Sequence, residues 1–167
     1  QAEVEPLQQV ITLLGIDPGY TGALAFLDPG SRALRIEDMP TAPNTKGRIE
    51  LDLHRLGQLL GEHGEAQRLV SVLEFVAARP GQGAPATFRF GQGYGAIQMA
   101  LVGHGWERHS VTPTKWKKHF GLSSDKGVSR ALAAARFPDY ADHFTLVKHD
   151  GRAEAALIAL YALETIL

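Results

Sequence analysis

The stretch LLGIDPGYTG, residues 13–22, decides the fold of this chain. An apolar run at residues 10–16 ends at Asp17, and Pro18-Gly19 then turns the chain toward a second apolar run at residues 23–27. A carboxylate at the mouth of a buried strand is costly to desolvate, so it usually has a cation as partner. Asp17 could instead cap its own turn, and this stretch alone leaves both interpretations open.

Length and composition are those of a globular protein. With 167 residues the chain can bury a core without cross-links, and we expect one domain at residues 10–167 after a disordered tail at residues 1–9. The absence of cysteine excludes disulfides, thiolate metal sites and a cysteine nucleophile. No apolar run approaches the roughly 18 residues that cross a membrane, so we expect neither a membrane partner nor a signal peptide.

The charge distribution is uneven although the net charge is only -1. That net charge argues against a general polyanion binder. Residues 104–152, however, carry nine Lys or Arg and five acids, which leaves the remainder acidic. A basic half beside an acidic site is expected of a protein that holds a polyanion together with a cation.

The hydrophobic pattern predicts strands and helices in a defined order. The expected strands are residues 10–16, 23–27, 33–37, 69–76 and 107–111, the first three as an antiparallel meander. The expected helices are residues 51–61 (ending at Gly61 or Gly64), 87–102, 113–120, 126–137 and 151–166. Residues 39–49 and 77–85 are expected to be loops. In the helix at 87–102, three glycines should weaken the first half.

Three further acids draw attention beside Asp17. Glu74 breaks an almost wholly apolar strand near its end, where a solvated edge position is the alternative. Asp150 and Glu154 lie four residues apart at the start of the last helix, and therefore on one side of it. Alone, they could be a helix-start carboxylate and a solvated glutamate.

The order of elements predicts an α/β protein with an RNase H-like fold, a five-stranded mixed sheet flanked by helices. If the first, fourth and fifth strands are parallel, Asp17 and Glu74 leave neighbouring strands at the same edge. Asp150 and Glu154 approach that edge from the closing helix. Four acids without thiolates form a hard oxygen site, so we expect Mg²⁺, or Mn²⁺ as the alternative, and no small-molecule cofactor.

Several motifs together resemble the RuvC-type Holliday junction resolvases, most closely their phage and chloroplast branch. The acidic motifs are GIDPG at residues 15–19, Glu74 in its apolar strand and DGRAEA at residues 150–155. The branch motifs are PGQG at residues 80–83, FGQGYG at 90–95 and TPTKWK at 112–117. Each motif alone is weak, whereas their order and spacing across nearly the whole chain after residue 10 are specific.

The resemblance implies four metal ligands, Asp17, Glu74, Asp150 and Glu154. Bacterial members usually have the last two acids three residues apart and both Asp, whereas here they are four apart and the second is Glu. That departure leaves open which of the two contacts which ion, and His149 is a neighbouring alternative ligand. Bacterial members also place two lysines near the scissile phosphate, which would correspond to Lys117 and Lys126.

The implied reaction is phosphodiester hydrolysis with two metal ions. Asp17 is expected to bridge the ions, with Glu74 on one and Asp150 and Glu154 on the other. Lys117 and Lys126 would neutralise charge that builds on the phosphate, although both could be solvated helix positions. Five further polar residues are expected to contact the DNA backbone: Arg79, Gln82, Arg89, Lys115 and Lys118.

Aromatic residues are the least determined part of the expected site. The wedge of the family often follows the strand-four Glu, yet Ala77 and Ala78 occupy that region here. Phe75, Phe88 or Phe90 could replace it. Trp116 is expected in the core rather than stacked on a base.

Three functions are consistent with these residues. The first is a metal-dependent endonuclease that resolves four-way DNA junctions, for which the resemblance implies a homodimer in the cytoplasm (nucleoid or phage-infected cell) or in an organelle. The second is a catalytically inactive or differently targeted module that binds junctions or branched nucleic acid. The third is a phosphate binder of the actin or sugar-kinase type, which normally needs two such domains. The 87–102 helix is the expected dimer interface, because its glycines permit close approach.

Overall fold

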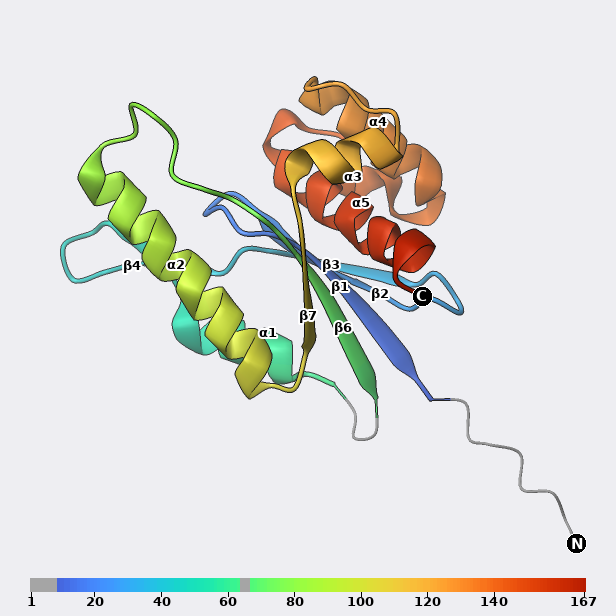
Figure 1. Ribbon diagram of the computed structural model, residues 1–167, viewed down its shortest axis with the longest axis horizontal. Helices are drawn as coiled ribbons and strands as arrows, with labels where there is room; N and C mark the ends of the chain where they lie inside the picture. Colours follow the sequence, from blue (N-terminus) through green and yellow to red (C-terminus); the bar gives the residue numbers. More distant parts are fainter. Residues whose placement is uncertain (1–8, 64–66) are drawn as a thin grey trace, which may run out of the picture.

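The computed structural model describes residues 9–63 and 67–167 (Figure 1). Its strands are β1 (Ile11–Asp17), β2 (Ala23–Leu27), β3 (Leu34–Asp38), β4 (Thr41–Pro43), β5 (Ile49–Leu51), β6 (Arg68–Glu74) and β7 (Glu107–Val111). Its helices are α1 (Leu53–Gly61), α2 (Ala84–Gly103), α3 (Pro113–His119), α4 (Lys126–Arg136) and α5 (Asp150–Thr165), with short 3₁₀ turns at Pro138–Phe144 and Val147–His149. Apart from Gln9, the tail expected at residues 1–9 lies outside the described residues, as does Gly64.

The main sheet has five strands in the order β3-β2-β1-β6-β7. β1 is antiparallel to β2 and parallel to β6, and β7 continues the parallel half. β2 and β3 are joined by the expected turn, in which the Asp28 carboxylate accepts bonds from the backbone and side chain of Ser31. This order confirms the RNase H-like topology expected from the sequence.

Helices cover both faces of the sheet (Figure 1). On one face α1 and α2 pack over apolar side chains that include Leu14, Ile16 and Leu73. On the other face α3, α4 and α5 pack over a second cluster that includes Leu13, Val70 and Trp116. Because β1 and β6 are covered on both faces, the side chains at their centres are mostly apolar. Among the described residues, no helix is long and apolar enough to cross a membrane.

The central helix α5 lies against β1 with almost no space between the two backbones. A Cβ atom on Gly15 would come within 2.1 Å of the Ala155 carbonyl oxygen and 2.4 Å of the Ala159 nitrogen. A Cβ on Gly151, at the start of the helix, would come within 2.4 Å of the Thr21 carbonyl oxygen. Two glycines therefore fix where α5 crosses the end of β1.

Two expectations about local structure are wrong. Residues 39–49 were expected to be a loop, but they contain most of a β4–β5 hairpin. Its turn is closed by the Asn44 side chain, which accepts bonds from the nitrogens of Lys46 and Arg48, and by Gly47 at φ 74°. The glycines were also expected to weaken the first half of α2, which is nevertheless one continuous helix. Packing of its buried residues Ile97 and Leu101 outweighs the loss of helix stability of about 1 kcal/mol per glycine.

Candidate metal and phosphate site

Asp17 and Glu74 end neighbouring parallel strands at the same edge of the sheet. Ile16 of β1 pairs with Leu73 of β6, so the two acids that follow leave the sheet side by side. The Asp17 carboxylate accepts a bond of 3.4 Å from the Gly19 nitrogen. The interpretation of Asp17 as a turn residue is therefore correct in part, but this single amide leaves most of the carboxylate available.

Glu154 joins these two acids from α5. It is buried although charged, at 6% exposure, because α5 crosses the end of β1 at Gly15. One carboxylate oxygen each from Asp17, Glu74 and Glu154 lie within 4.8 Å of one another. We call these three residues the acid cluster.

The acid cluster is electrostatically unfavourable as it stands. Burial, together with the nearby carboxylates of Glu154 and Glu74, raises the pKa of Asp17 to about 7. Burial also raises the pKa of Glu74, against a lowering by its hydrogen bond from Trp116. Groups held this close and this buried are stable as anions only beside a cation, which is the expected state of a metal site.

Trp116 fixes the orientation of Glu74. Its indole Nε1–H donates a bond of 2.7 Å to Glu74 Oε2, and the ring is fully buried. The expectation that Trp116 lies in the core is thus confirmed. Its bond occupies one oxygen of Glu74 and restricts the rotation of that side chain.

Two lysines approach Glu154 from different helices. Lys117 Nζ of α3 and Lys126 Nζ of α4 each lie 3.9 Å from Glu154 Oε1. Among the described residues that oxygen has no hydrogen-bond partner and is buried. A buried carboxylate oxygen that has no hydrogen-bond donor and lies close to two other carboxylates fits a divalent cation with oxygen ligands. The residues present therefore fit Mg²⁺ or Mn²⁺.

Asp150 and His149 lie outside the acid cluster. The Asp150 carboxylate is paired with the guanidinium of Arg130 from α4, and both side chains are about four-fifths buried. The His149 ring accepts a bond from the Leu146 nitrogen, and burial lowers its pKa, with Arg152 and Lys148 adding to the effect. The structure thus brings together three of the four acids expected as ligands, and the role of Asp150 stays a prediction.

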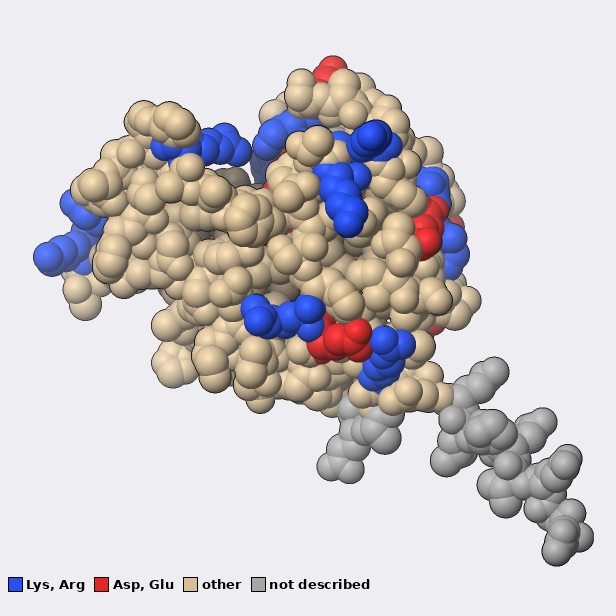
Figure 2. Space-filling model, viewed as in Figure 1, with Lys and Arg blue, Asp and Glu red and all other residues tan. Residues whose placement is uncertain are grey.

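A cleft of about 270 Å³ opens over the acid cluster. Arg79 and Gln82, from the loop before α2, and Phe90 of α2 form part of its wall. Figure 2 shows basic side chains on both sides of a hollow at this end of the molecule. Lys115 and Lys118 are exposed on α3, and Phe75 and Phe88 are exposed at 49% and 68%. Gln82 and Arg79 thus lie at the cleft, whereas the two α3 lysines are exposed and are not among the residues that line it.

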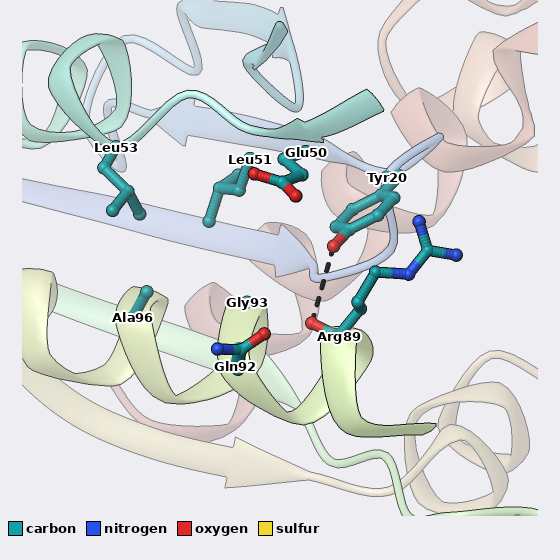
Figure 3. Close-up of a pocket in the computed structure, with 8 residues that line it drawn as sticks. All are labelled: Tyr20, Glu50, Leu51, Leu53, Arg89, Gln92, Gly93 and Ala96. Atoms are coloured by element: carbon teal, nitrogen blue, oxygen red, sulfur yellow. Dashed lines mark hydrogen bonds between the residues drawn. The ribbon is translucent and has the colours of Figure 1, made fainter. Parts of the chain in front are cut away.

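A second pocket, of about 460 Å³, lies on the hairpin side of α2 (Figure 3). The Tyr20 hydroxyl donates a bond of 3.4 Å to the Arg89 carbonyl oxygen and so joins the turn after β1 to α2. The Arg89 Nε atom is buried and has no hydrogen-bond partner among the described residues. Arg89 therefore lines this neighbouring pocket rather than the cleft over the acid cluster.

Sequence reasoning missed two partners of the site. Arg130 was counted only as part of the basic half, and the bond from Trp116 to Glu74 was not expected. Arg130 stands four residues after Lys126, the same spacing as Asp150 and Glu154. The matching four-residue spacing of two cations on one helix and two acids on another could have indicated that the helices pair through these residues.

The fold is RNase H-like, and the acid cluster is a set of oxygen ligands that could hold a metal ion. No protein-family model matches the chain. It is 34% identical over 116 residues to the Holliday junction resolvase MOC1, chloroplastic, of Chlamydomonas reinhardtii, over 67% of this chain and 13% of that protein. The chain thus spans a small part of the curated relative that it matches.

Solved structures of resolvases share the fold. Thermus thermophilus RuvC in complex with a Holliday junction substrate has a TM-score of 0.62 at 16% identity, covering 93% of this chain and 95% of that one. A second Thermus thermophilus RuvC structure has a TM-score of 0.59 at 19% identity over the same shares. The yeast mitochondrial resolvase Ydc2 has a TM-score of 0.53 at 17% identity, covering 95% and 80%. The expected resemblance to RuvC-type resolvases is confirmed.

Proposed function

We propose that this chain is a metal-dependent endonuclease that resolves four-way DNA junctions by paired symmetric nicks. The observation that carries the proposal is the acid cluster with Lys117 and Lys126 beside it, at the bottom of a cleft. The relative that is 34% identical is named as a Holliday junction resolvase, which supports junction DNA as the substrate. Its chloroplastic name supports an organelle as the proposed location, with a nucleoid or a phage-infected cell as the alternative.

Asp17, Glu74 and Glu154 of the acid cluster would hold the metal. Asp150 is the fourth proposed ligand, one helical turn before Glu154. When bound, two divalent ions supply an activated water nucleophile and stabilise the leaving 3′ oxygen.

The chain's own residues would position the phosphate and balance its charge. Lys117 and Lys126, now 3.9 Å from Glu154 Oε1, are close enough to turn toward a phosphate oxygen or the leaving oxygen. The Trp116 indole keeps Glu74 in one rotamer, so that the ligand does not have to reorganise when substrate binds. These groups account for the charge that builds during phosphodiester cleavage.

Backbone contacts would align the DNA over the cleft. Arg79 and Gln82 line the cleft, and Lys115 and Lys118 offer exposed cations on α3. Arg89 would contribute from the adjacent pocket. Contacts of this kind set register and orientation and give a steep dependence on salt, without reading the base sequence.

Paired nicks require two copies of the site, and α2 is the proposed interface. Phe88, Met99 and Val102 are exposed at 68%, 67% and 54%, and Gly91 and Gly95 lie between them on the same helical face. A Cβ atom at either glycine would contact nothing within 4 Å among the described atoms. The face therefore offers apolar side chains with space for a second helix, as a two-fold dimer needs.

Two other functions remain to be separated from this one. A junction-binding module without activity would not need the buried acid cluster, which costs stability. A phosphate binder of the actin or sugar-kinase type would turn over ATP. Incubation with a labelled four-way junction, a linear duplex and ATP, each with and without Mg²⁺, separates the three.

Symmetric nicks in the junction alone, only with Mg²⁺, are the expected result. Asp28→Asn serves as matched control, because Asp28 lies in the β2–β3 turn and its hydrogen bonds among the described residues stay within that turn, to Ser31, Arg32 and Ala33. It should cleave like the wild type, whereas Asp17→Asn should bind the junction without cleaving it. Binding without nicks in the wild type would overturn the proposal in favour of the second function.

A further inference from the structure

The two acids on α5 differ in their surroundings. Glu154 Oε1 has no hydrogen-bond donor among the described residues, and two lysines stand 3.9 Å away. Asp150, one turn earlier, is in direct contact with the guanidinium of Arg130. One acid is thus open to a metal ion, and the other already has a fixed cation.

Lys126 and Arg130 both come from α4 and repeat the four-residue spacing of the two acids. Lys126 faces Glu154, and Arg130, one turn later, faces Asp150. The cations follow one another along α4 in the opposite order to their partner acids along α5, so the two helices run antiparallel. We call each of these cation–carboxylate pairs a rung. The side chains of Arg130 and Asp150 are 19% and 20% exposed, so water screens this rung little.

A divalent ion at Asp150 would have to displace Arg130. The guanidinium Nη1 donates to Asp150 Oδ1 and so occupies one of the carboxylate oxygens that a metal would use. A dication placed beside it would also be repelled by it. A phosphate of the proposed substrate could replace Asp150 as the partner of the guanidinium, because Arg pairs with phosphate as readily as with a carboxylate.

We infer that Arg130 acts as an internal counter-ion that keeps Asp150 from metal until substrate binds, so that the DNA-free protein holds one divalent ion in the acid cluster and takes a second only with DNA. Arg130 is a positioning residue in this scheme. The inference rests on the proposed function for the identity of the substrate, although the occupancy of the DNA-free protein does not depend on it.

Counting Mn²⁺ ions bound to the DNA-free full chain by calorimetry and electron paramagnetic resonance tests this inference. The wild type should bind one ion tightly. Arg130→Met, which keeps the apolar bulk but removes the charge, should bind a second ion at least about tenfold more tightly than the wild type does. Arg130→Lys should lie between the two, because its single ammonium covers less of the carboxylate.

Arg136→Met is the matched control, because Arg136 is on the same helix but pairs with Glu164 instead. It should bind Mn²⁺ like the wild type. If Arg130→Met and Arg130→Lys both bind Mn²⁺ with wild-type stoichiometry and affinity, Arg130 does not control the second ion and the inference fails. A second ion that binds the DNA-free wild type as tightly as the first would overturn it as well.

A loss of folding in Arg130→Met would not leave the question open, because Asp150→Asn removes the same rung from the other side. In that variant the first ion should bind unchanged, and a junction should no longer recruit a second. Recruitment that survives Asp150→Asn overturns the inference. Failure of the nuclease proposal would look different, since it would appear as an intact junction with wild-type protein.

Discussion

Burial and two neighbouring carboxylates raise the pKa of Asp17, and the hydrogen bond from one turn amide lowers it. Its pKa of about 7 in the metal-free protein lies above the value of 3.8 that it would have in an unfolded chain. The folded state therefore binds the extra proton between about pH 4 and 7. Its contribution to stability is present at low pH and is lost as the pH rises through about 7.

Asp17→Asn should abolish junction cleavage and yet stabilise the metal-free protein. Above about pH 7 the substitution removes a buried anion beside Glu74 and Glu154, so we expect the free energy of unfolding to rise by about 1–4 kcal/mol. Urea denaturation in EDTA at about pH 8 measures the gain, which should shrink at about pH 5. A variant that is less stable than the wild type at about pH 8, or that still cleaves, contradicts the assignment.

Metal binding should release a proton below about pH 7. Asp17 must be ionised to act as a ligand, and its pKa is raised to about 7 by burial. The apparent affinity for Mn²⁺ should rise about tenfold per pH unit up to about pH 7 and then level off. Calorimetry in buffers of different ionisation enthalpy counts the proton. Asp17→Asn should show no such release, and a pH-independent affinity in the wild type would count against Asp17 as ligand.

At the residue scale, strand ends and spacing carry most of what can be predicted. Asp17 and Glu74 are found because a single charge ends an apolar run, and Glu154 because a second acid follows Asp150 at helical spacing. The pairing of Asp150 could not be predicted in this way. Arg130 is 20 residues earlier in the chain and reaches Asp150 only because two helices pack together.

At the scale of elements, the position of Glu154 depends on the contact between β1 and α5. Gly15→Ala would drive a methyl group into the backbone of α5 at Ala155 and Ala159. We expect a loss of about 1–3 kcal/mol or more in stability, because backbone atoms cannot move aside as a flexible side chain can. We also expect weaker Mn²⁺ binding, since α5 carries Glu154.

Gly103→Ala at the end of α2 is the control, where a Cβ meets nothing within 4 Å among the described atoms. Thermal denaturation and Mn²⁺ titration of both variants test the role of this contact. If Gly15→Ala melts like the control and binds Mn²⁺ as the wild type does, the contact does not set the position of Glu154.

Element boundaries were predictable where the sequence has strong end signals. Thr112 before Pro113 marks the start of α3, and its hydroxyl accepts a bond from the Lys115 nitrogen. The β4–β5 hairpin was missed because Pro40 and Pro43 disfavour strands, and its pairing depends on the side chain of Asn44. Continuity of α2 was missed because its stability comes from tertiary packing.

For the whole molecule, the proposed dimer predicts how the two nicks are coupled. Met99→Glu places a charge on the exposed apolar face of α2. Burying that charge in a helix–helix interface would destabilise the dimer. We expect a monomer by light scattering that still binds Mn²⁺ but no longer makes paired nicks. Val10→Glu, at a similarly exposed apolar position before β1, should stay dimeric. A Met99→Glu protein that remains dimeric would exclude this face.

The bond between Trp116 and Glu74 gives the protein an optical signal of its own. The chain has two tryptophans, and Trp106 lies in the other layer, where it donates to the Leu60 carbonyl oxygen. In Trp106→Phe all indole emission would come from Trp116. Its ring nitrogen donates a hydrogen bond to Glu74, a proposed metal ligand. Charge arriving at Glu74 should shift that emission. Ion binding could then be followed by fluorescence during a single turnover, with no label attached to protein or DNA.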